Sequence, residues 1–242
     1  MNRAIVLSSG TKVDFMIHGV FSFDFFGQKV WITTTHISLV LVILTLLFFA
    51  FIVNRKLKKL KPEDVPKGVV NVAELITEKL EGFVMSTMGS SGTKFVNYIS
   101  TIFIFILFCN FSGLFGLRPP TADYGVTFPL AIITFVLIHY NEFKHQKVKG
   151  VLKGLAEPWL IWAPINIIGN LAVPISLSLR LFANILSGTA IMALIYVLLS
   201  KVAFFWPAAL HVYFDLFSGS IQTYVFCMLT MTYIKNAIGN ED

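Results

Sequence analysis

Arg180 is the residue of this sequence whose position most directly suggests chemistry. It lies in an apolar run from Trp159 to Leu199, and no Lys, Asp or Glu occurs between Glu157 and Lys201. A guanidinium at the centre of a bilayer costs about 2.5–3.5 kcal/mol on insertion scales, so it usually faces a polar cavity or a charged partner. Arg180 therefore predicts a functional site inside a membrane. The alternative is an arginine that only ties neighbouring helices together through backbone carbonyls.

Two series of polar residues accompany this arginine on two apolar segments. In the first segment, Asn166 and Asn170 lie one helical turn apart, as do Arg180 and Asn184. In the second, spacings of four, three and four predict one continuous stripe along a helix face: His211, Asp215, Ser218 and Gln222. Two facing polar stripes predict a hydrated path for an ion. Interhelical hydrogen bonds, worth about 0.6 kcal/mol each on average, are the alternative, but they explain a buried Arg with a buried Asp poorly.

The hairpin that would carry the two series predicts which residues meet. In antiparallel helices that turn near residues 200–207, residues at similar distances from the turn lie at the same depth. Gln222 is then level with Arg180, and Asp215 lies nearer the outer side of the membrane. At that depth Asp215 can serve as a proton-access group.

The composition is that of an integral membrane protein with short loops. Of the 242 residues, 56% are hydrophobic and 13% are charged, against about 25% charged in soluble domains. The net charge of +6 comes mostly from two basic clusters, which argues for membrane orientation rather than nucleic-acid binding. Cys109 and Cys227 lie in apolar runs without metal-ligand spacing, so we interpret them as packed hydrophobic residues. No removable signal peptide is expected.

Membrane helices must position the polar residues, and we predict an all-α membrane protein with a single membrane domain, residues 1–242. Residues 1–33 are expected to form an arm outside the membrane. The basic run Asn54–Lys61 and a second basic loop, Lys144–Lys153, place both of these segments and the C-terminus in the cytoplasm, with the N-terminus outside. The five expected spans are residues 34–53, 95–117, 126–143, 165–199 and 208–234.

Two segments depart from a simple upright span. Residues 69–88 repeat apolar residues every three or four positions with charges opposite, which predicts an amphipathic helix at the cytoplasmic interface. Residues 165–199 would form a helix about 52 Å long, whereas the hydrocarbon core is about 30 Å thick. That helix must be steeply inclined or bend at Pro174, and with residues 208–234 it forms a long tilted hairpin. Residues Glu157–Pro164 predict a re-entrant or interfacial turn.

Four segments carry a resemblance to a known family, subunit a of the bacterial F-type ATP synthase, over nearly the whole chain. They are SLSLRLFANILSG (176–188), SIQTYVFCMLTMTYI (220–234), RPPTAD (118–123) and LKGLAEPWLIWAPINIIGN (152–170). The resemblance implies five spans, one amphipathic helix, and a tilted hairpin that faces a rotating ring of c subunits. It also implies b subunits of a peripheral stalk as partners, indirect contact with the F1 head, a bacterial cell membrane location and no cofactor or metal.

The resemblance extends to individual residues. Arg180 looks like the family's essential arginine, Asn184 and Gln222 match polar residues that flank it, and Asp215 matches a position where members carry a histidine or an acid. Asn166 and Asn170 depart from the family, since many members carry a carboxylate at one of these positions. This departure leaves H⁺ and Na⁺ both open as the transported ion.

The implied mechanism has two aqueous half-channels that do not meet. One is expected to open outside through His211, Asp215, Asn166 and Asn170, and the other to open to the cytoplasm beyond Arg180. Ion flow would drive rotation and ATP synthesis elsewhere in the complex, so this chain is expected to have no catalytic residues.

Three other classes of protein fit the sequence less well. A secondary anion transporter would usually show internal repeats, which are absent here. A structural membrane subunit would not need an intramembrane Arg and Asp. An enzyme built on Ser218 and His211 lacks a nucleophile-elbow context. His36, His139 and His145 are interpreted as interfacial or loop histidines.

Overall fold

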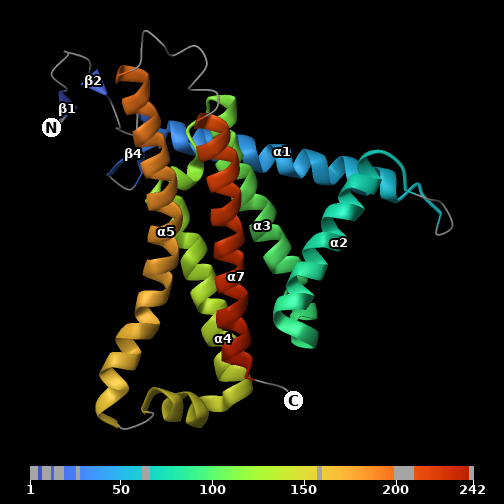
Figure 1. Cartoon of the computed structure of the whole chain (residues 1–242), viewed down its shortest axis with the longest axis vertical. Helices are drawn as coiled ribbons and strands as arrows, with labels where there is room; N and C mark the ends of the chain where they lie inside the picture. The colour runs from blue at the N-terminus through green and yellow to red at the C-terminus, as the bar shows by residue number, and fades with distance from the viewer. Residues whose placement is uncertain are drawn as a thin grey trace.

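The computed structural model describes residues 5–6, 12–13, 19–25, 28–61, 66–156, 160–198 and 210–239. These residues form a membrane-type helical bundle with a short β-structured arm at its N-terminal end (Figure 1). Four described helical segments are long and apolar enough to cross a membrane: Thr34–Leu57, Val96–Phe115, Tyr124–Gln146 and Ala163–Ile195. The prediction of an all-α membrane protein is therefore correct in class.

The N-terminal arm contains two antiparallel strand pairs, which were not predicted from the sequence. Strand β1 (Ile5–Val6) pairs with β2 (Lys12–Val13), and β3 (Gly19–Phe25) pairs with β4 (Gln28–Thr33). The segment GVFSFDF alternates apolar and polar residues, with Ser22 and Asp24 exposed, which is the period of a strand.

Helices α1 and α2 follow the arm. Helix α1 (Thr34–Leu57) extends four residues beyond the predicted end, because Arg55 and Lys56 occupy its last turn, where cations are favoured. Helix α2 runs over Val69–Met88, the range expected for the amphipathic helix, and a 3₁₀ segment, η1 (Gly89–Lys94), follows it.

Helices α3 and α4 form the middle of the bundle. Helix α3 (Val96–Phe111) continues into a 3₁₀ turn, η2 (Ser112–Phe115), and η3 (Pro120–Ala122) precedes α4 (Tyr124–Ala156). The prediction of a loop at Lys144–Lys153 is wrong in its conformation, because α4 continues through this segment. Its location in the cytoplasm stays a prediction. Lysine is a good helix former, and no proline interrupts the segment before Pro158.

The last two long helices carry the predicted site. A 3₁₀ turn, η4 (Leu160–Trp162), leads into α5 (Ala163–Leu198), which continues through Pro174 as one helix. A π-helix, η5 (Val212–Ser218), leads into α7 (Gly219–Ile238). Residues 157–159 of the predicted interfacial turn and the hairpin turn at 200–207 lie outside the described residues. The η5–α7 segment is not among the four candidate spans, since its many polar residues lower its hydropathy, and the fifth span stays a prediction.

The core lies between α2, α3, α4, α5 and α7. It is built from aliphatic and aromatic side chains of all five helices, including Val84, Ile99, Ala131, Leu181 and Phe226. Helices α3, α4, α5 and α7 run side by side, whereas α1 lies across them (Figure 1). We call the end where α4 begins and α5 finishes the arm end, and the end where α5 begins and α7 finishes the tail end.

Candidate functional site

Two contacts fix how α5 packs against η5 and α7. Asn184 Nδ2 donates a hydrogen bond to Ser218 Oγ at 3.1 Å. One turn further toward the arm end, a β-carbon placed on Gly188 would lie 3.5 Å from Phe214 Cδ1. Arg180 lies one turn before Asn184, and Gln222 lies one turn after Ser218. In this antiparallel arrangement Arg180 and Gln222 are therefore at the same level, as the hairpin argument predicted.

Arg180 and Gln222 differ in burial. The Arg180 side chain is exposed on the surface of the chain, and within the described residues it makes no hydrogen bond or ion pair. Gln222 is buried, with 8% of its surface exposed, and its Nε2 has no hydrogen-bond partner among the described atoms. An unsatisfied buried donor costs about 1–3 kcal/mol. The level of Arg180 thus has a cation and a buried amide for which the described residues provide no hydrogen-bond partner.

His211 and Asp215 form a close pair toward the arm end. His211 Nδ1 lies 2.7 Å from Asp215 Oδ2, and the two side chains are 34% and 13% exposed. The carboxylate rests against Gly113 of η2, where a β-carbon would approach Asp215 Cγ to 3.0 Å and its two oxygens to 3.1 and 3.2 Å. The Asp215 side chain is therefore held between its own helix and the end of α3.

The π-helix η5 changes the predicted stripe. Its backbone hydrogen bonds reach five residues instead of four, so each turn contains more residues than in an α-helix. As a result, Asp215 faces Gly113 on η2 while Ser218 faces Asn184 on α5. The prediction of one continuous α-helical stripe from His211 to Gln222 is wrong in this respect. π-Helical turns are frequent at functional sites.

The structure does not bring Asn166 and Asn170 to Asp215. Both asparagines lie in the first two turns of α5, at the tail end, and Asn170 lines a cavity together with Tyr233 and Asn236 of α7. The four residues therefore do not gather at one outward opening, and the path itself stays a prediction. Residues 166–170 and 211–215 are at opposite ends of antiparallel helices, so similar helix faces do not imply proximity.

Asn110 is the centre of a buried hydrogen-bond network that was not predicted from the sequence. Asn110 Nδ2 donates to Gly219 O at 3.0 Å and to Thr223 Oγ1 at 3.2 Å, and Thr121 Oγ1 donates to Asn110 Oδ1 at 2.7 Å. This network joins α3, η3 and α7 at the junction where η5 ends. A single Asn inside the apolar run before RPPTAD was the available signal.

The described residues contain no ligand set for a metal ion. Groups of three or more His, Cys, Asp or Glu side chains that could hold an ion do not occur in them. Cys109 and Cys227 are buried in the core as free thiols. The chemistry of the described part of the site therefore comes from Arg180, the His211–Asp215 pair and neutral amides.

Comparison with known proteins identifies the family. Residues 35–235 match the family model described as ATP synthase A chain. The chain is 36% identical over 196 residues to the sodium ion specific ATP synthase subunit a of Propionigenium modestum, covering 74% of this chain and 67% of that protein. It is 32% identical over 252 residues to ATP synthase subunit a 2 of Chlorobaculum tepidum, covering 93% and 71%.

The match to a third relative includes a larger share of that relative's length. The ATP synthase subunit a of Moorella thermoacetica is 29% identical over 208 residues, which cover 86% of this chain and 91% of that protein. The family match, the apolar helices and the intramembrane polar residues agree with one another. This chain belongs to the family of ATP synthase subunit a, a multi-pass component of the membrane sector that takes part in ion transport and ATP synthesis.

Proposed function

We propose that this chain is the stationary subunit that delivers ions to, and removes them from, a carboxylate on each c subunit of a rotating ring. The exposed Arg180, which has no partner within the described chain, is the single observation that carries the proposal. An intramembrane cation on a surface requires a charge or water to face it. A passing carboxylate on the ring meets that requirement.

Arg180 would act by electrostatics rather than by proton relay. A guanidinium keeps its proton in proteins, so it cannot pass one on. It attracts the ionised carboxylate, favours release of the bound ion, and blocks a direct leak between two half-channels. Gln222, buried at the same level with an unsatisfied Nε2, is placed to donate to the same carboxylate or to water.

The two half-channels would start at opposite ends of the bundle. The outer one is proposed to pass His211 and Asp215 at the arm end, and the inner one to open at the tail end, where Asn166 and Asn170 lie. With the basic residues after α1 in the cytoplasm, the N-terminus is outside and the C-terminus inside. Each ion then crosses the membrane bound to a c-subunit carboxylate while the ring rotates past Arg180.

A steep tilt of α5 and α7 is part of the proposal. Helix α1 is the most apolar of the candidate spans and has the smallest buried share, so it is the helix best suited to cross lipid upright. Because α1 lies across α5 and α7 (Figure 1), an upright α1 inclines the other two strongly. That inclination explains how a helix of 36 residues fits within a bilayer.

The partners and the energy source follow from the family. The proposed partners are the c-subunit ring, b subunits of a peripheral stalk and, indirectly, the catalytic F1 head, while this chain itself is non-catalytic. Each charge that moves through 100 mV releases about 2.3 kcal/mol, so several ions must cross for each ATP made. Co-purification with a c ring and a soluble ATPase would exclude the anion-transporter and purely structural alternatives.

Replacement of Arg180 tests the proposal. R180A should abolish ATP synthesis driven by an imposed ion gradient, while the complex still contains the ring and the F1 head. R180K should also fail largely, because lysine lacks the planar fork of arginine. ATP synthesis by assembled R180A complexes would contradict the proposed role.

The transported ion is proposed to be H⁺, with Na⁺ as a second candidate. The sodium ion specific relative from Propionigenium modestum favours Na⁺, and the His211–Asp215 pair favours H⁺ because both side chains can exchange protons. ATP hydrolysis by the purified complex with and without Na⁺ distinguishes the two. Protection of the c-subunit carboxylate by Na⁺ against carbodiimide would establish Na⁺.

A further inference from the structure

A cavity of about 200 Å³ lies at the tail end between α4, α5 and α7. A water molecule occupies about 30 Å³ of liquid, so the cavity has room for several. It is lined in part by polar side chains: His139, Glu142, Gln146, Asn170, Tyr233 and Asn236. Asn236 is exposed, which places part of the rim at the surface of the chain.

His139 and Glu142 bring a titratable pair to this cavity from within a candidate span. Both residues lie in α4 inside the apolar segment Tyr124–Gln146. His139 Nε2 is 3.9 Å from Glu142 Oε2, and the two side chains are 26% and 21% exposed. Ionisable residues at membrane depth usually mark an ion pathway. His139 was interpreted from the sequence as a loop or interfacial histidine, whereas in the structure it lies in α4 and lines the cavity.

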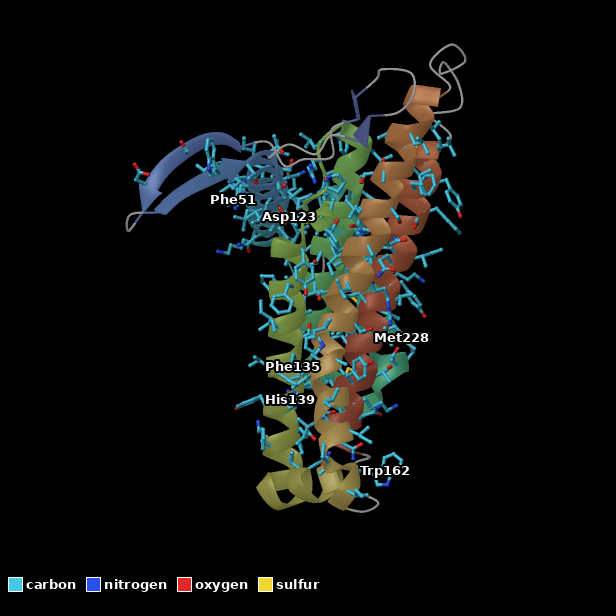
Figure 2. All side chains as sticks on the ribbon, turned by 90° about the vertical axis from the view of Figure 1, so that its left-hand side faces the viewer. Phe51, Asp123, Phe135, His139, Trp162 and Met228 are labelled. Atoms are coloured by element: carbon cyan, nitrogen blue, oxygen red, sulfur yellow. The ribbon has the colours of Figure 1, made fainter. Side chains whose placement is uncertain are left out.

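The hydrogen bonds of His139 determine which ring nitrogen can take up a proton. His139 Nδ1 lies 3.0 Å from Phe135 O, one turn earlier on α4 (Figure 2). A carbonyl oxygen only accepts hydrogen bonds, so Nδ1 must carry the hydrogen. In the neutral ring Nε2 is then the basic nitrogen, and it is the nitrogen near Glu142. The local bonding leaves a proton acceptor on the Glu142 side.

Val173 relates the cavity to Arg180 along α5. Val173 lines the cavity and lies seven residues before Arg180, which is nearly the same direction around the helix, whereas Asn170, ten residues before Arg180, is turned about 80° from it. At 1.5 Å per residue the cavity is about 15 Å from the arginine, toward the tail end. Among the described lining residues α5 contributes no acid or base and α7 contributes Tyr233, so the imidazole and the carboxylate on the cavity wall both come from α4, as His139 and Glu142.

We infer that the His139–Glu142 pair on α4 receives protons in the inner half-channel and passes them to water at the cavity rim. The step is balanced: Nε2 gains one proton to form imidazolium, Glu142 stabilises that charge, and the same proton leaves to water. This inference rests on the proposed function and supplies the acid–base groups that Asn166 and Asn170 on α5 lack.

The test compares two histidines of the same helix. H139N keeps a donor for the Phe135 carbonyl but removes Nε2. His145 makes the same kind of bond, with Nδ1 2.9 Å from Asn141 O, and does not line the cavity, so H145N is the matched control. ATP synthesis by the whole complex is measured in inverted membrane vesicles, where the tail end faces the buffer.

H139N is expected to lower the rate about tenfold, since a positioned acid–base group contributes about 10²-fold or more and cavity water replaces part of it. It should also change the pH dependence of the rate, because the imidazole is removed. E142Q should lower the rate and keep that dependence, because His139 remains. Equal rates and pH profiles for H139N and H145N would overturn the inference.

A second variant tests the cavity while leaving His139 and Glu142 in place. Asn236 is exposed at the rim, so N236C is expected to assemble normally. Labelling it with a bulky maleimide should block the cavity and lower ATP synthesis, and an unchanged rate after full labelling would overturn the inference. R180A is assayed alongside: ATP synthesis by R180A refutes the proposed function, whereas inactive R180A with unaffected H139N and labelled N236C refutes the inner pair alone.

Discussion

At the scale of single residues, the Asp215 carboxylate is held by two close neighbours, His211 and Gly113. Its Oδ2 lies 2.7 Å from His211 Nδ1. Gly113 has no side chain, and a β-carbon at this position would crowd the carboxylate. In the proposed outer half-channel, these two contacts would determine how Asp215 is positioned.

The charge of Asp215 can be removed with little change in shape. We expect D215N to slow ion transport by the assembled complex while leaving its subunit content unchanged, because Asn is nearly isosteric but does not ionise. The measurement is ATP-driven ion uptake by membrane vesicles, normalised to the amount of this chain. A wild-type rate would exclude Asp215 from the path.

A substitution of Gly113 also tests whether the position of the Asp215 carboxylate affects ion transport. G113A places a methyl group 3.0 Å from Asp215 Cγ, so the carboxylate must shift, and we expect transport to slow with Asp215 intact. Gly82, also helical, has no atom within 4 Å of the position that a β-carbon would take, and G82A should transport normally. If G113A and G82A were equally active, the contact would have no influence on transport.

The sequence predicted residue types better than residue contacts. Arg180 and Gln222 could be placed at one level because helix spacing and antiparallel pairing are sufficient for that argument. The contact of Asp215 with Gly113 and the cavity position of His139 depend on tertiary packing between distant segments, which periodicity within one helix does not reveal.

At the scale of elements, the Asn110 network joins α3, η3 and α7 where the π-helix ends. Asn110 and Thr121 are fully buried, with 1% and 0% of their surfaces exposed, and bond to each other at 2.7 Å. Buried polar groups are costly when left unpaired, so this network fixes the position of α7 against α3.

Thr121 tests the strength of this junction. T121V keeps the side-chain shape but leaves Asn110 Oδ1 without its donor, and we expect a loss of about 1–3 kcal/mol. Thr101 bonds only within α3, to Asn97 O at 2.7 Å, and is exposed, so T101V is the matched control. Thermal denaturation of the purified complex should show a lower transition for T121V than for T101V; equal transitions would contradict the role of the network.

Element boundaries were predictable where the sequence contains a strong local signal. The range of α2 follows from its apolar period and the flanking Gly68 and Gly89, both of which adopt positive φ. The extension of α4 through a lysine-rich segment and the π-helical form of η5 were not predictable, because charge pattern indicates exposure rather than backbone conformation.

At the scale of the whole molecule, the orientation in the membrane is a consequence of charge distribution. The basic residues after α1 favour the cytoplasm, so in the proposed orientation the β-structured arm lies outside. Ser22 in the arm and Lys59 after α1 are both exposed, and the two native cysteines are buried.

Cysteine labelling of intact cells checks this orientation. S22C should react with a membrane-impermeant maleimide added to intact cells, and K59C should react only after the membrane is opened. The unsubstituted chain, with Cys109 and Cys227 in the core, provides the background. The reverse pattern would invert the proposed outer and inner ends.

The exposed position of Arg180 also has a consequence for the chain before assembly. In the proposed complex the ring faces Arg180, so a newly inserted copy with no ring beside it would expose a cation to lipid, at a cost of about 2.5–3.5 kcal/mol on insertion scales. Such a copy should be less stable in the bilayer than the assembled subunit. In cells that make no c subunits, pulse-labelled chain should be cleared by membrane proteolysis faster than in normal cells, and R180A should prolong its lifetime.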